Sequence, residues 1–368
     1  MIRRGSQPIL ALLIALAATL AAVSASAQDW LAGAGPDWQR VLAAAKKEGR
    51  VTVIGPAELA VPVTDGFLRD TGIEVEYLGA VASMAESRVG REARAGNVTI
   101  DFIFTGTGLL ALMKQGFVED ERARLLLPGA ADPGAWTDGH LKWVDNDQKY
   151  MLQTQAFVSS TPFYDTNASP GGLSSWRDLL DPRLKGKIVA YDPRSGGPGQ
   201  QMVGYIGAQF GIDFLKSLYV GQGVIYSQDS RQMAEWVGRG VYAVALGVVI
   251  SDYVTLHDAG ITNLVVANMK DGPGTISGGF SVALMPKGAP HPNAATVFLN
   301  WFASRPGQQV YSRVEKQSSR RLDVHEPTSV DFTVPKPGVK YLDQYNEDWA
   351  LNQRAKIIEA VLEALGGR

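Results

Sequence analysis

Apolar residues follow two alternating patterns along most of the chain. Short apolar runs rich in β-branched residues, such as 51–54 and 100–104, predict buried strands. Between such runs lie stretches with helical spacing. In the helix expected over 38–48, the residues on one face are Trp38, Val41, Leu42 and Ala45. This alternation is typical of α/β layers built around parallel strands.

The alternating elements form two units. The first ends with the strand 100–104, and the second begins after Thr154. Two extended segments, 150–159 and 278–286, connect the units, so we expect two lobes, each a mixed sheet flanked by helices, joined by two hinge crossings. The expected division is lobe one over 28–152 plus 277–330, lobe two over 153–276, and an extension over 331–368 whose closing helix packs on lobe two.

The amino-terminal residues have the organisation of a secretory signal peptide. Two arginines precede an apolar run over 9–23, and Ala25-Ser26-Ala27 offers small residues to signal peptidase. The run is shorter than the roughly 20 apolar residues of a membrane-spanning helix. We therefore expect residues 1–27 to be removed by cleavage after Ala27, leaving a periplasmic protein. The chain has no cysteine, so we expect neither a lipid anchor nor thiol chemistry.

The charges of the chain are nearly balanced, with 35 Lys and Arg against 37 Asp and Glu. This balance lacks the basic excess of a nucleic-acid-binding surface. The four histidines show no metal-ligand spacing, and no serine lies in a G-x-S-x-G motif. We expect no nucleic-acid partner, no metal, no cofactor and no catalytic residue. A triad assembled from distant residues keeps a periplasmic enzyme as an alternative.

Four segments carry a resemblance to a known family. They are 43–50 (AAAKKEGR), 175–188 (SWRDLLDPRLKGKI), 192–199 (DPRSGGPG), and 291–301 (HPNAATVFLNW) with Gly307-Gln308 after it. With these segments the mature chain resembles the extracellular solute-binding proteins of ABC importers, which include the ferric-iron-binding proteins. The resemblance implies the two-lobed type II periplasmic binding protein fold. It also implies a monomer that captures a small-molecule ligand in the inter-lobe cleft and delivers it to a membrane permease.

Ligands of α/β lobes bind beyond the carboxyl ends of the strands, which selects loops of both lobes. In lobe one the candidate ligand-binding residues are Pro56, Ala57, Glu58, Thr105, Gly106 and Thr107. In lobe two they are Arg194, Ser195, Gly196, Gly197, Gly199, Gln200, Asp229, Arg231, Ser251 and Tyr253. Two polar residues of the crossings, Gln155 and Ser277, complete the set.

The loop 194–200 indicates the chemistry of the ligand. Its glycines let a ligand approach the backbone, and the following helix start offers N–H groups and the positive end of its dipole. Arg194 can add a bidentate contact to a carboxylate or phosphate. The leading prediction is therefore a small organic anion. In the alternative interpretation, the loop is a tight turn with Arg194 in a structural ion pair.

Three other segments have structural alternatives beside their functional ones. Asp229 can simply cap a helix, with Arg231 solvated in its first turn. The resemblance places 249–253 (VISDY) where ferric-binding relatives carry adjacent tyrosines, but only Tyr253 is a phenol here, so iron transport is the alternative to an organic anion. In the tail, the resemblance implies that Arg320-Arg321 leads from the lobe-one helix toward the hinge, and a surface ion pair is the alternative.

Overall fold

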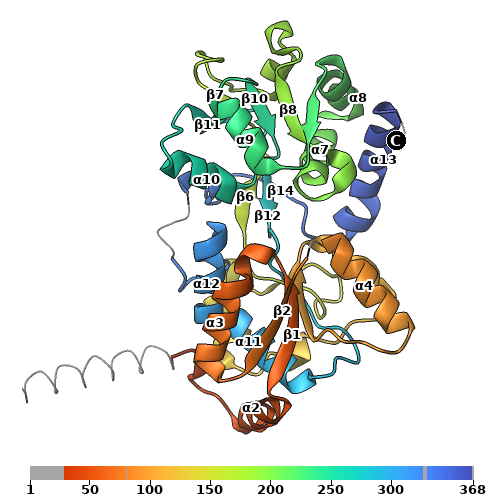
Figure 1. Cartoon of the computed structure of the whole chain (residues 1–368), viewed down its shortest axis with the longest axis vertical. Helices are drawn as coiled ribbons and strands as arrows, with labels where there is room; N and C mark the ends of the chain where they lie inside the picture. Colours follow the sequence, from red (N-terminus) through yellow and green to blue (C-terminus); the bar gives the residue numbers. More distant parts are fainter. Residues whose placement is uncertain (1–28, 81, 326–329, 367–368) are drawn as a thin grey trace, which may run out of the picture.

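A computed structural model describes residues 29–80, 82–325 and 330–366. In it the chain forms two α/β lobes stacked along the long axis of the molecule (Figure 1). The predicted signal peptide and its cleavage site lie outside the described residues. Within the described part of the chain, no helix is long and apolar enough to span a membrane.

Lobe one contains a six-stranded mixed sheet. Its strands, in spatial order, are β2 (Glu74–Gly79), β1 (Arg50–Gly55), β3 (Phe102–Thr105), β13 (Val282–Leu284), β5 (Leu152–Gln153) and β4 (Lys142–Trp143). β1 runs parallel to β2 and β3, whereas β13 pairs antiparallel with β3 and β5. Because β13 comes from far along the chain, two separate parts of the sequence build this sheet.

Helices cover both faces of the lobe-one sheet, which explains why β1 is buried along nearly its whole length. One face is covered by α2 (Pro36–Glu48), α3 (Ala60–Thr71), α11 (Pro292–Phe302) and α12 (Arg305–Glu315). The other is covered by α4 (Ala82–Arg94) and α5 (Leu110–Lys114). The helix expected over 38–48 ends where predicted, because Gly49, the next residue, adopts a φ of 78° and its N–H donates to the Ala45 carbonyl.

Lobe two contains a five-stranded mixed sheet. Its strands, in spatial order, are β11 (Leu264–Val266), β7 (Phe163–Asp165), β10 (Val244–Leu246), β8 (Ile188–Tyr191) and β9 (Ile225–Ser227). β10, β8 and β9 are parallel. One face packs against α7 (Gly197–Phe210), α8 (Ile212–Lys216) and α13 (Arg354–Ala364), and the other against α9 (Ser230–Gly238) and α10 (Ile250–Asp258).

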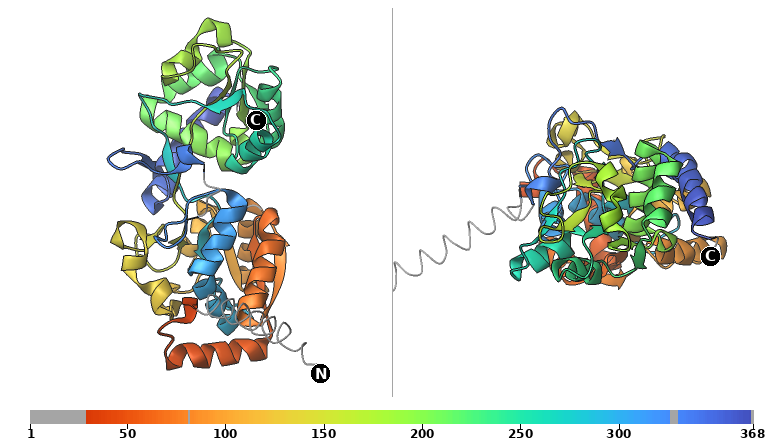
Figure 2. Two further views of the ribbon diagram at one scale, coloured as in Figure 1. Left: turned by 90° about the vertical axis from the view of Figure 1, so that its left-hand side faces the viewer. Right: turned by 90° about the horizontal axis from the view of Figure 1, so that it is seen from above.

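A small third sheet lies between the lobes. It consists of β6 (Phe157–Ser159), β12 (Thr275–Ser277) and β14 (Leu342–Asp343). β6 lies in the first predicted crossing, and β12 ends one residue before the second. β14 lies in the predicted extension, where the sequence did not indicate a strand (Figures 1 and 2).

The segment 342–364, which we call the C-terminal strap, touches both lobes. Near β14, Asp343 pairs with Lys142, Tyr345 donates from its hydroxyl to the Gly279 carbonyl at 2.8 Å, and Glu347 accepts from the Asn146 N–H at 3.0 Å. The strap then forms α13 against α7 and α8 of lobe two. It therefore links the lobes through side-chain contacts as well as through the backbone.

Candidate functional site

The predicted loops of both lobes lie at the carboxyl ends of their strands. In lobe two, β8, β9 and β10 are parallel, so the helices that follow them (α7, α9 and α10) begin at the same edge of the sheet. Figure 1 shows this edge facing lobe one, with α10 directly above α12. The structure therefore brings most of the predicted ligand-binding residues to the region where the lobes meet.

The start of α7 requires glycine. Gly196 and Gly197 adopt φ values of 86° and 54°, which side chains rarely tolerate. A Cβ on Gly199 would lie 2.6 Å from the Asp192 carbonyl oxygen. The first N–H groups of an α-helix have no intrahelical acceptor, and the helix dipole makes this end positive. The loop can therefore bind an anionic group through its backbone.

Arg194 is held in an ion pair with Asp192. Its Nε donates to Asp192 Oδ1 and its Nη2 to Asp192 Oδ2, both at 2.8 Å, and the guanidinium lies 5.3 Å above the Tyr226 ring centre. Burial alone would raise the pKa of Asp192, but the hydrogen bonds from Arg194 lower it. Ser195 donates its hydroxyl to the Asp192 carbonyl at 2.7 Å. The ion pair leaves Nη1 of the oriented guanidinium available to a ligand.

The loop after β9 has mainly local contacts. Asp229 caps α9 by accepting the Gln232 N–H at 2.9 Å, and Arg231 forms an exposed ion pair with Glu235. Ser230 accepts the Val249 N–H at 2.8 Å and so ties this loop to the start of α10.

The loop after β10 places Ser251 in the first turn of α10 and Tyr253 in an aromatic cluster. The Tyr253 ring packs 5.2 Å from Phe163 and 5.5 Å from Phe332, measured between ring centres. Burial raises the pKa of Tyr253, which opposes the phenolate that a ferric ligand would supply. Across the described residues, no group of three or more His, Cys, Asp and Glu side chains could hold a metal ion.

In lobe one, the loop after β1 is fixed by Tyr77. Its hydroxyl donates to the Pro56 carbonyl at 2.7 Å, and a Cβ on Gly55 would overlap both the Tyr77 hydroxyl and the Phe104 ring. Pro56 is buried, whereas Ala57 and Glu58 are exposed. The loop thus presents Glu58 from a rigid support.

Glu315, at the end of α12, was not predicted from the sequence. It is only 1% exposed, and no donor of the described residues reaches either carboxyl oxygen. Its polar neighbour is the Glu58 carboxyl. Burial, followed by the negative charge of Glu58, raises the pKa of Glu315 to about 8. At neutral pH a protonated Glu315 can therefore donate to the Glu58 carboxylate. The sequence did not indicate a role for Glu315, because a single acidic residue in a helical stretch is usually exposed to solvent.

The loop after β3 meets the C-terminal strap. Thr105 is buried, and its hydroxyl has no partner among the described residues. Gly106 separates it from Thr107, whose hydroxyl accepts a hydrogen bond from Arg354 Nη1 at 3.2 Å. The strap thus reaches a predicted ligand-binding residue.

The predicted residues of the crossings are engaged within the protein. Gln155 donates its side-chain amide to Gln308 Oε1 at 2.6 Å, and its Oε1 accepts from the Ser312 hydroxyl at 3.3 Å. Ser277 lies 3.3 Å from the Tyr345 hydroxyl and accepts the Gly279 N–H at 3.1 Å. Gln155 thus ties the first crossing to α12 of lobe one, and Ser277 ties the second to the strap.

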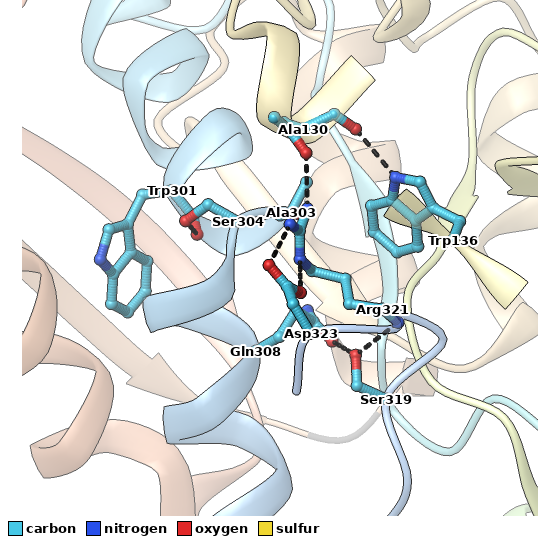
Figure 3. Close-up of polar contacts among 10 residues, drawn as sticks. Ala130, Trp136, Trp301, Ala303, Ser304, Gln308, Ser319, Arg321 and Asp323 are labelled. Carbon is cyan, nitrogen blue, oxygen red and sulfur yellow. Dashed lines mark hydrogen bonds and ion pairs between the residues drawn. The ribbon is translucent and has the colours of Figure 1, made fainter. Parts of the chain in front are cut away.

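Arg321 lies inside lobe one, so the alternative of a surface ion pair is wrong. Its guanidinium donates to the Gly129 carbonyl at 2.7 Å, to the Ala303 carbonyl at 3.1 Å, and to both Asp323 oxygens at 2.8 Å (Figure 3). It also lies 5.5 Å from the Trp136 ring centre. Figure 3 shows these contacts joining the turn after α11 to the chain that returns toward the hinge.

Known proteins resemble this chain in sequence and in structure. A family model described as bacterial extracellular solute-binding protein matches residues 63–320. An uncharacterized protein of Haemophilus influenzae is 30% identical over 145 residues, which cover 37% of this chain and 38% of that protein. The chain thus matches well under half the length of this relative.

Solved structures share the fold over most of the chain. The periplasmic binding protein AfuA of Actinobacillus pleuropneumoniae, described with fructose-6-phosphate bound, has a TM-score of 0.65 at 18% identity, covering 86% of this chain and 98% of that one. Iron-bound HitA of Pseudomonas aeruginosa has a TM-score of 0.61 at 17% identity, covering 86% and 97%. An ABC-transporter substrate-binding protein of Agrobacterium tumefaciens has a TM-score of 0.65 at 19% identity, covering 87% and 96%. These similarities confirm the predicted two-lobed type II fold.

Proposed function

The chain belongs to the bacterial extracellular solute-binding proteins, and from this premise we propose that it captures a small organic anion between its lobes and delivers it to the permease of an ABC importer. In this proposal the protein works in the periplasm after cleavage behind Ala27. Residues 28–152 with 277–330 move as one lobe against 153–276, and the extension 331–368 follows through the strap.

The observation that carries the ligand class is the start of α7. Its glycine-rich turn presents backbone N–H groups at the positive end of a helix, beside a guanidinium that Asp192 holds in place. Because Arg194 is already oriented, less conformational freedom is lost when it binds a carboxylate or phosphate.

An acidic group of lobe one can accept hydrogen bonds from the uncharged part of such a ligand. Burial raises the pKa of Glu315 to about 8, and Glu58 presents exposed oxygens that can accept hydrogen bonds. A hydroxyl-bearing carbon skeleton can donate to the exposed Glu58 oxygens while its anionic group lies at lobe two. Delivery to a permease is supported by the family and by the ABC-transporter origin of a structural relative.

Ligand binding can be tested on the purified mature protein. Native mass spectrometry identifies any co-purified compound, and thermal denaturation is then followed with citrate, glucose 6-phosphate, glucose and ferric citrate. We expect an anionic organic compound to stabilise the protein by about 2.7 kcal/mol at a hundredfold excess over its Kd, with compaction in small-angle scattering and no turnover. Stabilisation by ferric citrate together with a tyrosinate-to-iron absorption band would instead support the iron alternative.

A matched pair of variants tests the role of Arg194. Arg183 forms the same type of two-oxygen ion pair with Asp181, but it is 89% exposed. Arg194→Met should weaken anion binding by about tenfold or more, whereas Arg183→Met should leave it unchanged. Equal affinities of the two variants would show that the start of α7 does not bind the anion through Arg194.

A further inference from the structure

Arg354 lies where the C-terminal strap passes between the lobes. It is the first residue of α13, and its Nη1 donates to the Thr107 hydroxyl of lobe one at 3.2 Å. Its Cγ lies 3.7 Å from the position that a Cβ on Gly204 of α7 would take. The aliphatic stem therefore packs on lobe two while the guanidinium reaches lobe one.

The charge of Arg354 has no counterion in the described part of the chain. Arg194 and Arg321 each pair with a carboxylate, but the hydrogen bond to Thr107 involves a neutral hydroxyl. Burial lowers the pKa of Arg354, and the Tyr345 hydroxyl opposes this only in part. A cation that is removed from water without an opposite charge is costly. Such a charge is expected where a ligand supplies the missing anion.

The surroundings of Arg354 leave room for that anion. Arg354 and Gln200, in the first turn of α7, line a shallow, open depression of about 430 Å³ between α7 and the C-terminal strap. Glu359 also lines this depression but forms no ion pair with Arg354. α13 further contacts the turn 193–195 that precedes α7. The guanidinium and the positive end of α7 therefore lie in one neighbourhood.

We infer that Arg354 binds the anionic group of the ligand, a carboxylate or a phosphate, from the strap. This inference rests on the proposed function and deepens it, because it adds a binding residue that belongs to neither predicted set of loops. The anion would contact Arg354 together with Gln200 and the start of α7, while Thr107 holds the guanidinium from lobe one. Binding would thus involve both lobes and the strap at once.

Isothermal titration of the mature protein with citrate, glucose 6-phosphate and inorganic phosphate tests the inference. Arg354→Met removes the charge and keeps the length of the stem, and Arg354→Lys keeps the charge but loses the planar fork. Lys356→Met removes an exposed charge from the same helix and serves as the control. We expect a loss of about tenfold or more in Arg354→Met, a smaller loss in Arg354→Lys, and less than about a twofold change in Lys356→Met.

A measurement on the unmodified protein guards against a variant that folds poorly. In nitrogen-labelled protein, the anion that binds should shift the Nε–Hε resonance that is absent in Arg354→Lys. If the unmodified protein binds an anion but that resonance stays in place and Arg354→Met binds equally well, the inference is wrong and the proposed function stands. If the unmodified protein binds none of the anions and is stabilised only by a neutral or cationic compound, both are wrong.

Discussion

Two arginines of this protein, Arg321 buried and Arg354 partly buried, lie in opposite surroundings. Arg321, inside lobe one, donates to two carbonyls and both oxygens of Asp323, whereas Arg354, between the lobes, donates to a single threonine hydroxyl. The Arg321 network ties together segments of one lobe and satisfies its charge internally. The difference indicates that complete pairing marks the scaffold, and that incomplete pairing of a buried charge marks the place for a ligand.

The largest expected effect is that of Arg321→Met. The change leaves the Gly129 and Ala303 carbonyls without their donor and Asp323 without its cation, so we expect a loss of about 3 kcal/mol in the free energy of unfolding. Chemical denaturation measures it, with the exposed Arg239→Met as control. A loss below about 1 kcal/mol would show that this network is not a structural tie.

The next effect comes from Gly207→Val, which tests how Arg354 is held. A Cβ on Gly207 would lie 2.5 Å from Ile357 Cγ2, so a side chain there must push α13 away from α7. We expect a loss of about 2 kcal/mol in stability, accompanied by weaker anion binding because Arg354 moves with α13. Denaturation and titration check the two parts. If the variant is destabilised but binds the anion with unchanged affinity, the position of α13 does not control the contribution of Arg354 to binding.

Glu315→Gln should change the pH dependence of stability. The pKa of Glu315 is raised from its ordinary value of 4.5 to about 8 in the folded protein, so the unfolded chain loses this proton first as the pH rises. The contribution of Glu315 to the free energy of unfolding is therefore greatest below about pH 4 and decreases as the pH rises to about 8. We expect Glu315→Gln to be more stable than the unmodified protein by about 2 kcal/mol at pH 6 and equal to it at pH 4.

Thermal or urea denaturation between pH 4 and pH 8 measures this difference. Glu363→Gln, an exposed change on α13, is the control and should leave the pH profile as it is. If the stability of Glu315→Gln varies with pH in the same way as that of the unmodified protein, Glu315 is ionised like an ordinary surface carboxyl.

The smallest effect on stability is expected from Arg354→Met in the absence of ligand. Removing a partly buried charge without a counterion costs little and can even stabilise, so the change should lie between zero and a gain of about 1 kcal/mol. Denaturation of the ligand-free variant beside Arg321→Met gives the direct contrast. A loss as large as that of Arg321→Met would make Arg354 part of the scaffold and remove the distinction between the two arginines.

The sequence predicts the layers of the fold well and the pairing of side chains poorly. Buried strands such as 51–54 and helix stops such as Gly49 follow from local periodicity and backbone chemistry, and the structure contains both. β14 has only two residues, which is too short for a periodic pattern, so the strand that the extension adds between the lobes was not predicted.

The candidate site shows the same limit. Strand ends indicate which loops face the other lobe, because that depends on the order of elements along the chain. Whether Arg194 meets Asp192, Arg321 meets Asp323, or Arg354 meets no carboxylate depends on contacts that no local pattern encodes. Glu315 was missed for the same reason.

The third strand between the lobes has a mechanical consequence. Two adjacent strands allow one body to bend and also to twist against another, whereas a third strand bonded beside them, with α13 anchored on the far body, resists the twist. We therefore expect the two lobes to open and close by a rotation about a single hinge axis. Shortening the chain before residue 342 should widen the spread of interlobe angles seen by small-angle scattering.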